Sequence, residues 1–135
     1  MLAKGTTAAV LLPASTFFLR AATPPVRALR DAGAVLAIAT DLNPGTSPVC
    51  SMPEAIAMAC TLYGLAPLEA LPAATANAAW VLGLHERLGT LEVGKRADFL
   101  LLEEPGFAQV PYRPGHDPVV ATFVGGRLVA GRVTH

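Results

Sequence analysis

Short apolar runs alternate with a helical pattern in the first part of the chain. Residues 8–12 and 35–39 are continuous apolar runs of strand length, and Pro13 ends the first of them. Between them, residues 24–33 place apolar side chains on one side of a helix that Gly33 would end. Continuous apolar runs are typical of strands buried on both faces. The pattern therefore predicts a strand, a crossover helix and a second strand, which together form a parallel βαβ unit.

Two more helices are predicted beyond this unit. In the first, Ser51 is placed as the N-cap, Glu54 is placed to reach back in a capping box, and Gly64 can end the helix. Residues 68–82 then form a second helical stripe. Pro72 lies inside this stripe, so we expect a kink or a fresh helix start there.

The pattern changes to short strands near the C-terminus. Residues 98–102 are typical of a strand, and residues 105–118 form a long connection rich in proline and glycine. Two apolar runs, 119–124 and 127–130, flank Gly125–Gly126, a two-residue sequence typical of a β-hairpin turn. The predicted fold class is α/β, with the end of an α/β unit followed by a small β appendage.

Composition adds limits to this picture. The chain has 135 residues, about one domain, whereas a complete α/β barrel needs roughly 250. Hydrophobic residues make up 53% and charged residues 15%, against about 25% charged in ordinary soluble domains. These values exclude a disordered tail and a coiled coil, and two cysteines exclude a disulfide scaffold. A small domain has a large surface for its volume and should carry more charge than this. The composition is therefore typical of the interior of a larger protein.

Charge and hydropathy also limit the partners. Ten basic residues balance ten acidic ones without a basic run, so we expect no nucleic-acid partner. No apolar stretch reaches about 18 residues, so we expect no membrane span. A signal peptide is an alternative interpretation, with Lys4 as its basic start and residues 8–19 as its apolar region. A buried strand that ends in a turn explains the same residues, and Cys50 and Cys60 are then free thiols in a reducing compartment.

Candidate chemistry gathers in residues 39–48, directly after the second predicted strand. Ligands of parallel α/β folds bind beyond the carboxyl ends of the strands, which is where Asp41 falls. Its carboxylate could ligate a metal ion and accept a proton from water. Asn43, Gly45 and Thr46 could then hold a polar substrate. The alternative is that these residues simply form a turn, since Asp, Asn, Pro and Gly all favour turns.

No second metal-ligand motif accompanies Asp41 in the sequence. The three histidines are too far apart to form an H-x-H or H-x-x-x-H pair: His85, His116 and His135. Cys50 has no histidine beside it to activate it as a nucleophile. Cys60 is expected in the core, on the apolar face of its helix.

Four segments resemble the metal-dependent amidohydrolase superfamily, and two of them narrow the resemblance to its imidazolonepropionase family. The sequence D-L-N-P-G-T at 41–46 resembles the end of the last barrel strand in these enzymes, and G-T-T-A-A-V-L-L-P-A-S-T-F-F-L-R at 5–20 the preceding strand and loop. Residues 73–84 and 88–102 resemble a C-terminal signature shared across the superfamily. The resemblance spans nearly the whole chain, from about Gly5 to Arg132.

The resemblance implies a specific reaction. These enzymes hydrolyse 4-imidazolone-5-propanoate to N-formimidoyl-L-glutamate in the cytoplasm, during histidine degradation, with one zinc or iron ion. Asp41 would be a metal ligand and the acceptor of the hydrolytic water's proton, and Asn43, Gly45 and Thr46 would line the pocket for this small-molecule substrate. The parent enzyme could form a homodimer.

The resemblance also implies an incomplete fold. Residues 1–83 would form the last two strand–helix units of a TIM-type barrel, and residues 84–135 the strands of a β-sandwich. The family's H-x-H pair, its further histidine ligand and its substrate-gripping arginine and tyrosine have no counterpart here. One carboxylate cannot hold a catalytic zinc ion, which needs about three protein ligands. We therefore expect an inactive C-terminal fragment that is prone to association, because its strands near Val10 and Ile38 lack neighbours.

Three other interpretations stay open. The same fold could serve another amidohydrolase, such as a deaminase or a dihydroorotase-like cyclic amidase, although Asn-Pro-Gly-Thr after Asp41 argues against this. The chain could be a non-catalytic assembly module that is stable only against a partner chain. It could also be a small secreted α/β binding protein, for which cleavage near Ala22 would be required.

Overall fold

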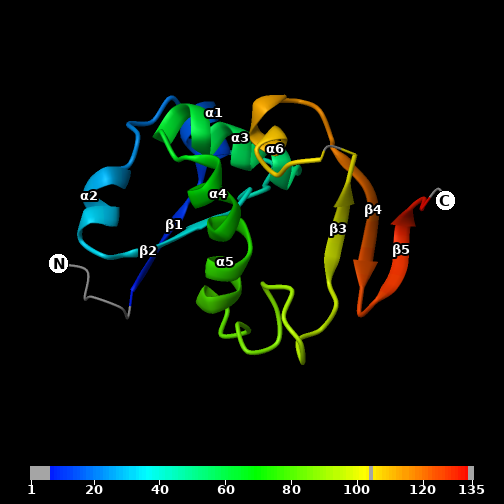
Figure 1. The fold of residues 1–135 in the computed structure, drawn as a ribbon. Coiled ribbons are helices and arrows are strands. Elements are labelled where there is room, and N and C mark those ends of the chain that lie inside the picture. The colour runs from blue at the N-terminus through cyan, green and yellow to red at the C-terminus, as the bar shows by residue number, and fades with distance from the viewer. Residues whose placement is uncertain (1–6, 104, 134–135) are drawn as a thin grey trace.

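Two parallel strands form the centre of the first part of the molecule. The computed structural model describes residues 7–103 and 105–133 (Figure 1). Strand β1 (Ala8–Leu11) pairs with β2 (Val35–Ile38) in parallel, with Ala8 opposite Val35 and Leu11 opposite Ile38. Helix α2 (Val26–Asp31) lies in the segment that connects them. The predicted βαβ unit is therefore confirmed.

Helix α1 (Pro13–Leu19) follows β1 directly and was not expected from the sequence. Pro13 does end the strand, but it also occupies the first turn of this helix. Proline suits that position because its φ is already helical and its missing N–H needs no partner there. Arg20, in the left-handed conformation at φ 52°, ends the helix.

Helix α3 (Met52–Tyr63) has the predicted ends. The Ser51 hydroxyl accepts a hydrogen bond from the Glu54 amide at 3.3 Å, and Gly64 ends the helix at φ 70°. The prediction that Glu54 reaches back to complete the capping box is wrong. Its carboxylate accepts a hydrogen bond from the Gly115 amide instead. That contact ties α3 to the loop after α6 (Gln109–Tyr112), a short helix inside the connection that was expected to be irregular.

The second helical stripe is two helices, α4 (Pro67–Ala74) and α5 (Ala76–Val81). The break lies at Thr75, not at Pro72, which remains inside α4. Pro72 lacks the amide that would bond to the carbonyl four residues earlier, yet α4 continues and closes with a tight turn from the Thr75 amide to the Pro72 carbonyl at 3.1 Å. Helix α5 packs on the sheet, where the Asn77 side chain donates to the Leu36 carbonyl at 2.8 Å.

The core lies between the parallel strands and the helices α3 and α4. Its buried side chains come from all of these elements: Leu11, Leu36, Ile38, Ile56, Ala59, Ala70 and Ala73. Ile38 is 2% exposed, whereas Val10 on the paired strand is 46% exposed. Both strands were expected to lack neighbours, and in the described residues each pairs only with the other. The Ile38 side chain is nevertheless buried within this chain. Helices α3 and α4 supply the apolar cover that β1 lacks at Val10.

A separate antiparallel sheet forms the other side of the molecule (Figure 1). Its order is β3 (Phe99–Leu102), β4 (Val119–Val124) and β5 (Arg127–Gly131). Gly125 and Gly126 both have positive φ, 58° and 76°, as a type I′ turn requires, so the predicted hairpin is confirmed. The Asp98 carboxylate accepts from the Gly125 amide at 2.8 Å, and its pKa is lowered mainly by its hydrogen bonds from Arg96. No helix in the described residues is both long enough and apolar enough to cross a membrane.

Candidate active site

Asp41 and Ser15 meet beyond the carboxyl ends of the two parallel strands. Leu11 and Ile38 are the last paired residues of β1 and β2, so the segments that follow them leave the sheet side by side. Ser15 lies in the first turn of α1, and its hydroxyl donates to Asp41 Oδ2 at 2.7 Å. The predicted candidate residue is therefore joined by a serine that sequence reasoning did not select. The available signal was positional, since Ser15 follows the first strand as Asp41 follows the second.

The backbone at Asp41 is in the left-handed region, at φ 53°. Non-glycine residues rarely adopt this conformation, and aspartate and asparagine are the side chains that tolerate it best. The Asn43 side chain donates to the Asp41 carbonyl at 2.6 Å and so holds the peptide that follows this turn. The Asp41 side chain is exposed, and in the described part of the chain only Oδ2 has a hydrogen-bond partner.

Asn43 organises the loop from within. Its Oδ1 accepts from the amides of Gly45 at 2.9 Å and Thr46 at 2.7 Å, and its Nδ2 also contacts the Thr46 hydroxyl at 2.9 Å. These bonds form an Asx turn, as the alternative interpretation of the segment expects. The polar atoms of Asn43 are occupied inside the loop, so contact of Asn43, Gly45 and Thr46 with a substrate stays a prediction.

Ser47 closes the loop on its buried side. Its side chain is fully buried, and its hydroxyl donates to the Thr40 carbonyl at 2.6 Å. The Asn43 amide donates to the Ser47 carbonyl at 3.0 Å. The loop at 40–47 is thus a compact unit that presents Asp41 at the end of β2.

Replacing Asn43 with alanine should loosen this loop without unfolding the domain. The variant loses the hydrogen bonds that the Asn43 side-chain amide donates and accepts. Their loss should lower the free energy of unfolding of the loop by about 1–3 kcal/mol. Amide hydrogen exchange measured by NMR should speed up at Gly45 and Thr46, whose N–H groups lose their acceptor. Exchange in α3 should stay unchanged and serves as the internal control, and unchanged exchange at Gly45 and Thr46 would contradict the role given to Asn43.

Helix α1 is held firmly beneath the site. The Pro13 side chain is fully buried, and Ala14 and Ser15 are only 1% and 7% exposed. The Tyr63 hydroxyl on α3 donates to the Thr16 hydroxyl at 2.6 Å. Burial raises the pKa of Tyr63, and the hydrogen bond to Thr16 opposes that rise.

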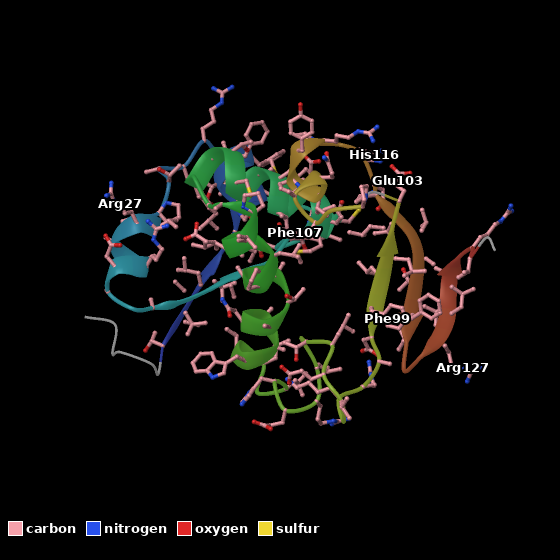
Figure 2. The ribbon with its side chains drawn as sticks, in the orientation of Figure 1. Arg27, Phe99, Glu103, Phe107, His116 and Arg127 are labelled. Carbon is pink, nitrogen blue, oxygen red and sulfur yellow. The ribbon has the colours of Figure 1, made fainter. Side chains whose placement is uncertain are left out.

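The donor set decides what metal chemistry these residues can support. Asp41 offers a carboxylate oxygen and so fits one ligand position of a zinc or iron ion. No cluster of three His, Cys, Asp or Glu side chains occurs among residues 7–103 and 105–133. His85 contacts Glu86 at 3.2 Å, and His116 contacts Glu103 on the side of the antiparallel sheet (Figure 2). A metal ion held by Asp41 would therefore need ligands beyond those that the described residues bring together.

The two cysteines lie outside this geometry. Cys50 is exposed, and Cys60 is half-buried and packs against the core, as predicted for its helix face. Burial raises the pKa of the Cys60 thiol. Such a thiol is a packing group, because a metal ligand or nucleophile requires the thiolate.

Comparison with known sequences identifies relatives across nearly the whole chain. The sequence model of the amidohydrolase family matches residues 1–129. The imidazolonepropionase of Rubrobacter xylanophilus is 51% identical over 128 residues, which are 95% of this chain and 31% of that protein. The imidazolonepropionase of Agrobacterium fabrum is 48% identical, over 96% of this chain and 31% of that protein. The chain thus spans about a third of the length of these curated relatives.

Solved structures show the same fold. The guanine deaminase of E. coli superposes with a TM-score of 0.76 and 25% identity, over 94% of this chain and 35% of that one. An adenosine deaminase from Xanthomonas campestris with bound zinc gives a TM-score of 0.74 and 28% identity, over 88% of this chain and 31% of that one. With the family match over residues 1–129, these likenesses show that the chain belongs to the amidohydrolase family and has its α/β fold.

Proposed function

We propose that this chain supplies the Asp41-bearing part of an imidazolonepropionase. The observation that carries the proposal is the identity of 51% and 48% with two such enzymes over almost the whole chain, including the loop that presents Asp41. The deaminase structures are only 25% and 28% identical. Within the amidohydrolase family, the sequence therefore favours hydrolysis of a cyclic amide, 4-imidazolone-5-propanoate, to N-formimidoyl-L-glutamate.

The proposed architecture follows from the parallel pairing of β1 and β2. Residues 1–83 would be the last two strand–helix units of a TIM-type barrel, with Asp41 at the carboxyl end of its final strand. Residues 84–135 would contribute strands to a β-sandwich, as the antiparallel order β3-β4-β5 supports. In the described residues β1 and β2 pair only with each other, so their open edges are where the remaining barrel strands would pair.

Asp41 would act in two ways in the reaction. As one ligand it would help to hold a zinc or iron ion, which when bound polarises water and the substrate carbonyl. As a base it would accept a proton from the water that adds to the ring carbonyl carbon, and then return it to the ring nitrogen as the C–N bond breaks. One molecule of water is consumed, giving the new carboxyl group and the released N–H. Asn43, Gly45 and Thr46 would line the substrate pocket, directly or through their backbone.

An exchange chimera tests the proposal. In it, the matched segment of the Rubrobacter xylanophilus enzyme is replaced by this chain, which supplies the corresponding third of that protein. We expect the purified chimera to bind metal and to hydrolyse 4-imidazolone-5-propanoate, measured by product formation. A chimera that binds metal but deaminates guanine or adenosine instead would favour the deaminase alternative, and one that binds no metal would favour an assembly module.

The isolated chain serves as the companion measurement. With one carboxylate donor it should bind no zinc stoichiometrically and show no turnover, because a catalytic zinc ion needs about three protein ligands. Tightly bound zinc with turnover would overturn this part of the proposal. We further propose that the parent enzyme acts on a small-molecule substrate, lies in the cytoplasm and forms a homodimer.

A further inference from the structure

We propose that Ser15 is a positioning residue for Asp41. Its hydroxyl binds Oδ2 at 2.7 Å, which leaves Oδ1 as the oxygen available for the metal ion and the hydrolytic water. The inference rests on the proposed function for its catalytic meaning, whereas the contact itself is a property of this chain.

Ser15 can hold Asp41 because its own position is over-determined. It is 7% exposed, and the two residues before it are buried. The hydroxyl of the next residue, Thr16, accepts a hydrogen bond from the Tyr63 hydroxyl. This bond joins α1 to α3 beside Ser15. Ser15 therefore reaches Asp41 from a backbone position that packing and the Thr16–Tyr63 bond hold in place.

Among the described residues, the Ser15 contact is the side-chain hydrogen bond to Asp41 that comes from outside the loop at 40–47. The left-handed backbone at φ 53° and the Asn43 bond to the Asp41 carbonyl set the position of the main chain. They leave the side chain free to rotate about its Cα–Cβ bond. The hydrogen bond from Ser15 to Oδ2 removes that freedom by joining α1 to the loop that follows β2.

Fixing one oxygen matters because a ligand that also accepts a proton must keep its second oxygen in one place. Hydrogen bonds to ligating carboxylates commonly govern metal affinity and activity, with losses of about 10–100-fold when they are removed. A serine that merely satisfied its own hydroxyl would affect folding stability and nothing at the carboxylate.

The first experiment compares Ser15→Ala with Thr16→Val in the full 135-residue chain. Each change removes one hydroxyl from α1, but only the first removes the contact to Asp41. Three-bond couplings between the Asp41 carboxyl carbon and its backbone atoms, measured by NMR, report the side-chain rotamer. We expect one rotamer in the original chain and in Thr16→Val, and averaged couplings in Ser15→Ala. Unchanged couplings in Ser15→Ala would overturn the proposal.

The second experiment places the same variants in the exchange chimera. Ser15→Ala should weaken zinc binding about tenfold and lower kcat about tenfold, with KM unchanged. Thr16→Val should alter neither, and Ser15→Thr, which keeps a hydroxyl, should recover much of both. Equal zinc affinity and kcat in Ser15→Ala and the parent chimera would reject the positioning role. An inactive parent chimera would instead count against the proposed function, while the rotamer measurement would still decide whether Ser15 holds Asp41.

Discussion

Asp41→Asn in the exchange chimera is expected to reduce turnover of 4-imidazolone-5-propanoate by roughly three orders of magnitude or more. The substitution preserves size, and asparagine tolerates the left-handed backbone at this position as well as aspartate does. Ser15 can still donate to the amide oxygen, so the local fold should persist. The side chain loses its negative charge, and with it a strong metal-ligand interaction and the ability to accept a proton from water.

Asp31→Asn provides the matched control for this loss. Asp31 is an exposed aspartate at the end of α2, with a side chain 65% exposed. The same chemical change there should leave turnover and metal content unaltered. Metal content measured by plasma emission spectrometry should fall in Asp41→Asn alone. Retention of more than a tenth of the original activity by Asp41→Asn would contradict the role assigned to its carboxylate.

Ile38→Ala should produce a large loss of stability. Ile38 is 2% exposed and belongs to the core between β2 and the helices α3 and α4. Removing buried methylene and methyl groups from such a site costs about 2–5 kcal/mol, through lost burial and the cavity left behind. Urea unfolding followed by circular dichroism should show this as a lower free energy of unfolding.

Val10→Ala is the control on the neighbouring strand. Val10 pairs with Ala37 in the same two-stranded sheet but is 46% exposed, so its truncation should cost no more than about 0.5 kcal/mol. A loss as large as that of Ile38→Ala would mean that Val10 is covered in solution. The comparison therefore also tests whether association in solution covers the sheet face that carries Val10.

Local sequence signals predicted the elements whose ends depend on neighbouring residues. Ser51 and Gly64 define the ends of α3 as expected, because a hydroxyl N-cap and a left-handed glycine act within one helical turn. Gly125–Gly126 defines the hairpin for the same reason, since the turn needs two positive φ angles. The parallel pairing of β1 and β2 also followed from apolar runs joined by a helix.

The expectations that were wrong involve residues whose partners lie elsewhere in the chain. Pro13 begins a helix as well as ending a strand, because α1 packs beneath the site. Glu54 turns from Ser51 to the Gly115 amide, a partner 61 residues away. A break was predicted at Pro72, but the helix ends at Thr75. One lost backbone hydrogen bond near the end of a short helix therefore does not end it.

The sequence by itself determined the family resemblance, the α/β class and Asp41 as the residue on which the proposed chemistry depends, because these are carried by short contiguous motifs. Tertiary structure alone decided that Ser15 binds Asp41, and that Ile38 is buried while Val10 is not. The physical reason is that hydrogen bonding and burial depend on the distance between atoms in space. The parallel pairing of two strands brings Ser15 and Asp41 within 2.7 Å across 26 positions of sequence.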